Sequence, residues 1–104
     1  MSWNKLVRDR ISGIIAADGK SAVTRVLGAD EYRAALRDKL LEECSELLDA
    51  GTDEIASEAA DVLEVIFSYC SLHDMTEEQI LAVREHRGKE RGCFNDRVLL
   101  IETH

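Results

Sequence analysis

The chain has 104 residues, of which 45% are hydrophobic, so we expect one domain spanning residues 1–104 with a modest core. Its 21 acidic and 13 basic residues give a formal net charge of -8. This charge argues against nucleic-acid binding, because a surface that binds nucleic acid must be basic to neutralise the phosphates. The sequence has no long apolar run and no signal-peptide pattern, which predicts a cytoplasmic protein without a membrane span. Cys44, Cys70 and Cys93 lack metal-site spacing and indicate free thiols in a reducing compartment.

The lack of proline, together with glycines placed between periodic segments, predicts long uninterrupted helices. A first, short helix is expected over Val7–Ala17, with Gly19 as its C-terminal stop. Val23–Leu27 is rich in β-branched residues and is closed by Gly28, so this segment is expected to be extended.

Two longer helices follow. Asp30 is expected to cap the second helix, which continues to Ala50 and carries an apolar stripe on one side. Thr52 or Asp53 is expected to cap the third helix, over about Glu54–Leu72, whose core stripe includes Ile55, Ala59, Val62, Leu63, Ile66 and Cys70.

A fourth helix completes the set. Thr76 and Gln79 form a capping-box pattern at its start, and it is expected to run to about Glu90. The apolar tail at 97–102 is expected to be a short strand or an extended arm. The predicted fold is therefore all-α, a four- to five-helix bundle with short extended segments near 23–27 and 97–102.

Two pairs of carboxylates lie on the second and third helices. Glu43 and Glu46 form one pair and Glu58 and Asp61 the other, each with the i, i+3 spacing that points both side chains the same way. Glu43 falls inside the apolar arc of its helix and Glu58 flanks that of the next, although carboxylates are seldom placed there unless paired or coordinating. Four carboxylates on neighbouring helices predict a site for a hard divalent cation, Mg²⁺ or Mn²⁺.

Cationic residues gather near both ends of this acidic chain. They are Lys5, Arg8 and Arg10 at one end, and Lys89, Arg91 and Arg97 at the other. Such side chains can bind triphosphate oxygens, and the neighbouring Trp3 and Phe94 offer a flat surface to a base. Ordinary salt bridges to acidic neighbours, or charges that complement a helix C-terminus, are the alternative interpretation, which is favoured for Arg10.

Four short motifs follow one another along the chain, each occurring once. They are Lys5-Leu-Val-Arg-Asp-Arg-Ile11, Glu42-Glu-x-x-Glu46, Glu58-Ala-Ala-Asp-Val-Leu-Glu-Val65 and Lys89-Glu-Arg-Gly-Cys-Phe-Asn-Asp-Arg97. Together they resemble the MazG-like all-α nucleoside triphosphate pyrophosphohydrolases, more narrowly the small single-domain branch related to phosphoribosyl-ATP pyrophosphohydrolase. The chain departs from that pattern at Ser12, where proline is common, and at Cys93, where a second glycine is common.

The resemblance implies Mg²⁺-dependent hydrolysis of a nucleotide between its α and β phosphates, which releases a monophosphate and pyrophosphate. The residues that match the family's metal ligands are Glu43, Glu46, Glu58 and Asp61. Glu46, and after it Glu42, are the candidates for activating the attacking water. The candidates for binding the nucleotide are Lys5, Arg8, Lys89, Arg91, Phe94 and Arg97.

Two other classes of protein are compatible with helices rich in carboxylates. A di-iron bundle requires E-x-x-H pairs, which His73, His86 and His104 do not provide. A non-catalytic helical dimeric module with acidic surfaces is the remaining alternative. Independently of these classes, the continuous apolar surface of the third helix predicts a homodimer or a dimer of dimers, with the site near the interface.

Overall fold

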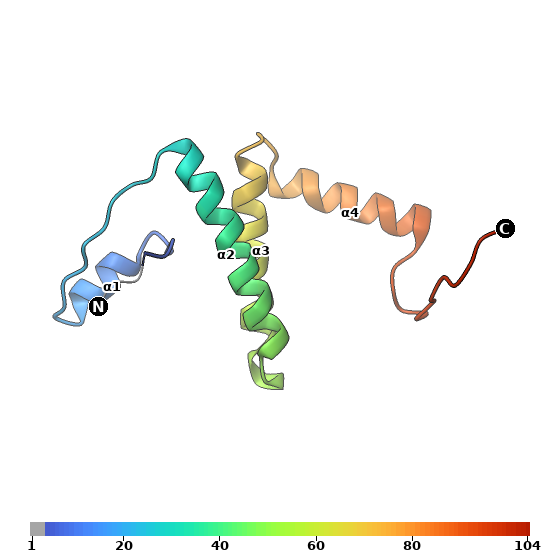
Figure 1. Cartoon of the computed structure of the whole chain (residues 1–104), viewed down its shortest axis with the longest axis horizontal. Helices are drawn as coiled ribbons and strands as arrows, with labels where there is room; N and C mark the ends of the chain where they lie inside the picture. The colour runs from blue at the N-terminus through green and yellow to red at the C-terminus, as the bar shows by residue number, and fades with distance from the viewer. Residues whose placement is uncertain (1–3) are drawn as a thin grey trace.

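The computed structural model describes residues 4–104, and within them the chain is helical without any β-strand (Figure 1). The elements are α1 (Ile11–Ala17), α2 (Ala29–Asp49), the short 3-10 helix η1 (Thr52–Glu54), α3 (Ile55–Ser71) and α4 (Glu77–Arg91). The expectation of an all-α chain is confirmed. The segments 23–27 and 97–102 have no regular secondary structure; the first connects α1 to α2 and the second follows α4. No described helix is both long and apolar enough to cross a bilayer.

The first helix is shorter than predicted, because it begins at Ile11 instead of Val7. Its end follows the prediction. Gly19 has a φ of +78°, its N–H donates to the carbonyl of Ala16, and the next N–H donates to the carbonyl of Ile15. This pair of bonds is a Schellman motif, which requires the left-handed conformation that glycine adopts without strain.

The predicted side-chain caps of the two middle helices do not form in the described chain. The second helix begins after Gly28, and Asp30 lies inside its first turn, where a carboxylate still complements the positive end of the helix dipole. Thr52 and Asp53 belong to η1, and α3 starts without a side-chain cap. The continuous hydrogen-bonded turn of η1 takes the place of such a cap.

The fourth helix has the predicted capping box. The N–H of Gln79 donates to Oγ1 of Thr76 at 3.2 Å, and the N–H of Thr76 donates to Oε1 of Gln79 at 2.8 Å. Two otherwise unpaired donors at the helix start are thus satisfied. At the other end, Gly92 has a φ of +79° and closes the helix after Arg91.

Helices α2 and α3 run antiparallel and pack side by side, whereas α1 and α4 project away from them (Figure 1). Within the described residues, α2 and α3 are the α-helices that pack on each other over any length. The radius of gyration is 18.0 Å, compared with about 13 Å for a compact domain of this size. A single chain is therefore a helical hairpin with two flanking helices, and the predicted bundle is not formed within one chain.

The seam between the two packed helices contains both apolar and acidic side chains. Among the described residues, Leu36 and Val65 are the fully buried hydrophobic side chains, and Glu43 is buried with them. Glu43 lies two turns after Leu36 on α2, and Glu58 lies two turns before Val65 on α3. The carboxylates are therefore held inside the contact between the helices.

An apolar face lies beside the seam and remains exposed in the single chain. We define this apolar face by Leu41 and Leu48 of α2, which are 72% and 84% exposed, and by Ile55 and Leu63 of α3, which are 48% and 49% exposed. These side chains turn away from the seam, and Leu41, Leu48 and Leu63 lie on the outer sides of their helices. The prediction that Ile55 and Leu63 belong to the core is therefore wrong for one chain.

Replacing Thr76 by alanine should loosen α4, because the helix loses its cap and has little packing to hold it. Loss of such a cap is worth about 1 kcal/mol, so we expect amide exchange over residues 77–91 to accelerate by roughly fivefold in hydrogen-exchange mass spectrometry. Thr52→Ala is the matched control, since the Thr52 side chain caps no helix. Equal acceleration in both variants would contradict the role of the capping box.

Candidate metal centre

The structure brings together three of the predicted ligands. Glu43 of α2 and Glu58 and Asp61 of α3 each place one carboxylate oxygen within 4.8 Å of the others. Glu43 is 7% exposed. Oε2 of Glu43 and Oε2 of Glu58 are buried and have no hydrogen-bond partner within the described chain. Unpaired buried oxygens cost free energy, and a hard cation is the kind of partner that would remove this cost.

Glu46 and Glu42 differ from the positions that periodicity suggested. A helical wheel places Glu46 at the edge of the apolar arc of α2 and Glu42 further towards solvent, but Glu46 is exposed and Glu42 is half-buried. Both form a second acidic group with Glu43, again with oxygens within 4.8 Å of one another. Glu43 therefore belongs to both groups, while Glu46 approaches it from the solvent side.

Lys39 is a member of this site that the sequence analysis missed. Its Nζ lies 3.3 Å from Oε1 of Glu43 and 3.6 Å from Oε2 of Glu42. Burial raises the pKa of the Glu43 carboxyl and the neighbouring Glu46 adds to this effect, whereas Lys39 opposes it. The i, i+4 spacing of Lys39 and Glu43 was a signal that could have identified the pair.

The first basic motif lies over the acidic cluster. Arg8 Nη2 is 2.7 Å from Oδ1 of Asp61, and its Nη1 is 3.6 Å from Oε1 of Glu64. Lys5 Nζ is 3.1 Å from Oε1 of Glu42, and this hydrogen bond lowers the pKa of the Glu42 carboxyl. The interpretation of Arg8 as a salt-bridge partner thus describes the single chain. Lys5 and Arg8 also stand about half exposed at the rim of the site.

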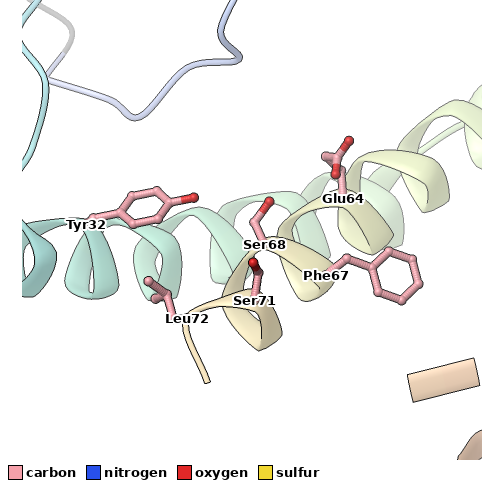
Figure 2. A pocket seen from close by; sticks show the side chains of 6 residues that line it. All are labelled: Tyr32, Glu64, Phe67, Ser68, Ser71 and Leu72. Atoms are coloured by element: carbon pink, nitrogen blue, oxygen red, sulfur yellow. The ribbon is translucent and has the colours of Figure 1, made fainter. Parts of the chain in front are cut away.

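A hollow of about 480 Å³ lies between the N-terminal segment and the two packed helices. This volume is within the range of small-molecule sites. Its walls include Glu43, Asp61, Lys39 and Arg8, so the acidic cluster opens into it. A second hollow, of about 290 Å³, is lined by Tyr32, Glu64, Phe67, Ser68, Ser71 and Leu72 (Figure 2).

The second basic motif lies apart from the acidic cluster in the single chain. The end of α4 and the segment after it lead away from α2 and α3 (Figure 1). Lys89 pairs with Glu85 at 3.4 Å, Phe94 is 97% exposed, and Arg91 and Arg97 are exposed. Trp3, the other candidate for contacting a base, lies outside the described residues.

Comparisons with known proteins identify one partial relative. A protein from Mycolicibacterium smegmatis, described only as uncharacterized, is 52% identical over 54 residues, which are 52% of this chain and 55% of the relative. The chain thus matches about half of that protein's length. No family model matches the sequence, and no solved structure matches it.

Replacing Glu43 by glutamine should stabilise the metal-free protein at neutral and alkaline pH. Because the folded-state pKa of Glu43 is raised, the wild type loses stability as the pH rises from the ordinary glutamate range through that pKa. The variant does not lose stability in this way. We therefore expect its free energy of unfolding to exceed that of the wild type by about 1 kcal/mol at pH 8, or several degrees in Tm, and by less at pH 4.

Thermal melts in the presence of a chelator measure this difference. Asp38→Asn is the control, because Asp38 is an exposed carboxylate on the same helix. A Glu43→Gln variant that is less stable than the wild type at pH 8 would show that the ion pair with Lys39 outweighs the burial of the charge.

Proposed function

We propose that this protein is a Mg²⁺-dependent nucleotide pyrophosphohydrolase, with Mn²⁺ as an alternative ion. It cleaves the α–β phosphate bond of a nucleoside triphosphate or a related nucleotide and yields a monophosphate and pyrophosphate. The observation that carries the proposal is the cluster of the buried Glu43 with the half-buried Glu58 and Asp61, which has two unpaired buried oxygens and lies at the wall of a hollow of about 480 Å³. The resemblance to MazG-like pyrophosphohydrolases supports the same reaction.

The residues of the cluster have the chemistry that this reaction requires. Glu43, Glu58 and Asp61 would hold the ion, and Glu46 stands at the solvent side of Glu43 as the fourth proposed ligand. A bound divalent ion supplies charge neutralisation at the phosphate oxygens, which is the main demand of phosphoryl transfer. Lys5 and Arg8 at the rim add positive charge for the substrate.

Glu46 remains the proposed residue for activating water, ahead of Glu42. Lys5 donates a hydrogen bond to Glu42, and this bond lowers the pKa of the Glu42 carboxyl. A carboxylate with a lowered pKa is a weaker base, and two lysines already occupy its oxygens. Glu46 is exposed beside the buried Glu43 and is accessible to water.

The proposed partner is a second copy of this chain, as a homodimer or a dimer of dimers. Two buried hydrophobic side chains among the described residues are a small core for a chain of this length. Covering the apolar face of each copy would complete a bundle. It would also allow the end of α4 and the segment after it in one copy, with Lys89, Arg91 and Arg97, to reach the acidic cluster of the other. We further propose that the protein acts in the cytoplasm, where it removes unwanted nucleotides from the pool.

A non-catalytic dimeric module is the second candidate, and one observation favours it. Arg8 with Asp61, Lys39 with Glu43, and Lys5 with Glu42 form a network that neutralises much of the acidic cluster without a metal ion. In that case the carboxylates stabilise the hairpin instead of binding a cation, and divalent ions should not affect the stability of the protein.

Turnover of a nucleotide panel tests the reaction. With Mg²⁺, the wild type should convert at least one nucleoside triphosphate to monophosphate and pyrophosphate, resolved by anion-exchange chromatography. Glu43→Gln and Asp61→Asn should each lower the rate by at least about 100-fold, because each removes a proposed ligand. Asp38→Asn should retain activity. Absence of turnover, together with a Tm unaffected by Mg²⁺, would support the non-catalytic module.

Light scattering on a size-exclusion column tests the assembly. The wild type should elute as a dimer or tetramer, and Leu41→Glu combined with Leu48→Glu should shift it to smaller species, because two charges would be buried at the proposed interface. Val26→Glu is the control, since Val26 is 97% exposed but lies on the connection before α2. A monomeric wild type would refute the proposed assembly.

A further inference from the structure

The acidic cluster is continuous with a region of different chemistry. The two hollows share Tyr32, Glu64 and Ser68, and the larger one also reaches Glu43 and Asp61. One end of the combined space thus holds the acidic cluster, and the other contains an aromatic ring and a hydroxyl group, with Glu64, which pairs with Arg8, between them. This is the polarity of a nucleotide, whose charged phosphates and flat base lie at opposite ends.

The spacing along the helices matches this arrangement. Tyr32 precedes Glu43 by three turns on the same face of α2, a rise of about 16 Å, and Ser68 follows Asp61 by two turns on α3. Because the helices are antiparallel, Tyr32 and Ser68 lie at the same end of the hairpin. Figure 2 shows the tyrosine ring lying along α2 with its hydroxyl directed towards Ser68 and Glu64, which shortens the gap to the acidic end.

The other described aromatic side chains are less suited to contact a base in this space. The ring of Phe67 points away from Tyr32 and Ser68 (Figure 2). Tyr69 packs against the ring of His73 with centroids 5.4 Å apart, and Phe94 is 97% exposed beyond α4. Tyr32 is half-buried and is the aromatic residue that lines the hollow containing Glu43 and Asp61.

We infer that Tyr32 and Ser68 form the base-binding end of the site. The base stacks on the ring of Tyr32 and exchanges a hydrogen bond with the hydroxyl of Ser68, while the buried Leu36 and Val65 form an apolar floor. Tyr32 and Ser68 determine specificity between nucleotides and take no part in bond cleavage. The inference rests on the proposed function, because it requires a nucleotide in the hollow.

A substrate without a base isolates this contact. The test compares kcat/KM for ATP, GTP, CTP and UTP with that for ribose 5-triphosphate, which keeps the sugar and phosphates. Tyr32→Leu should lower kcat/KM for the preferred nucleotide by about 10-fold or more and leave ribose 5-triphosphate unchanged. Tyr32→Phe, which keeps the ring, should restore most of the loss. Ser68→Ala should change the ratios between the four nucleotides without affecting the base-free substrate.

The outcomes separate this inference from the proposed function. An equal loss with both kinds of substrate, or no loss in Tyr32→Leu and Ser68→Ala, would overturn the assignment while leaving the reaction in place. A selective loss of nucleotide turnover in Phe94→Leu would also overturn it and place the base at the C-terminal motif. No turnover by the wild type would overturn the proposed function itself. If Tyr32→Leu fails to fold, Ser68→Ala with the same substrates decides.

Discussion

The contact between α2 and α3 buries a carboxylate in the same seam as the hydrophobic core, and the rest of the structure depends on this constraint. Leu36 and Val65 hold the helices together, while Glu43 is buried among the same contacts. A buried carboxylate with an unpaired oxygen lowers the stability of the hairpin. The seam is therefore not optimised for stability alone, as expected where binding or catalysis depends on the buried charge.

The cations around the seam reduce the free-energy cost of burying this charge without removing it. Lys39 reaches Glu43 from the preceding turn, and Arg8 reaches Asp61 from the N-terminal segment. The exposed Arg8 side chain can exchange partners at little cost, because a solvated ion pair contributes at most about 1 kcal/mol. The same N-terminal segment can therefore neutralise the cluster in the free protein and remain available to an anionic ligand.

The seam also explains why a single chain is an incomplete unit. Because the carboxylates use the faces of α2 and α3 that meet, much of the apolar surface of these helices lies on another side. Leu41, Leu48 and Leu63 remain exposed there, and α4 extends from the hairpin without covering them. A second copy could cover the exposed apolar side chains with its own helices. It could also bring the basic motif after α4 close to an acidic cluster.

The sequence by itself determined the helices, the Gly19 stop, the Thr76 capping box and the i, i+3 spacing that places Glu58 and Asp61 on one face of α3, because these depend on local spacing. On α2 the buried Glu43 lies in the apolar arc that the helical wheel predicted. On α3 only the tertiary structure decided the buried face, because packing on α2 buried Val65 and left Ile55 and Leu63 of the predicted core stripe exposed. The tertiary structure also placed Tyr32 beside the acidic cluster and Phe94 far from it, since distances between separate helices follow from packing and not from periodicity.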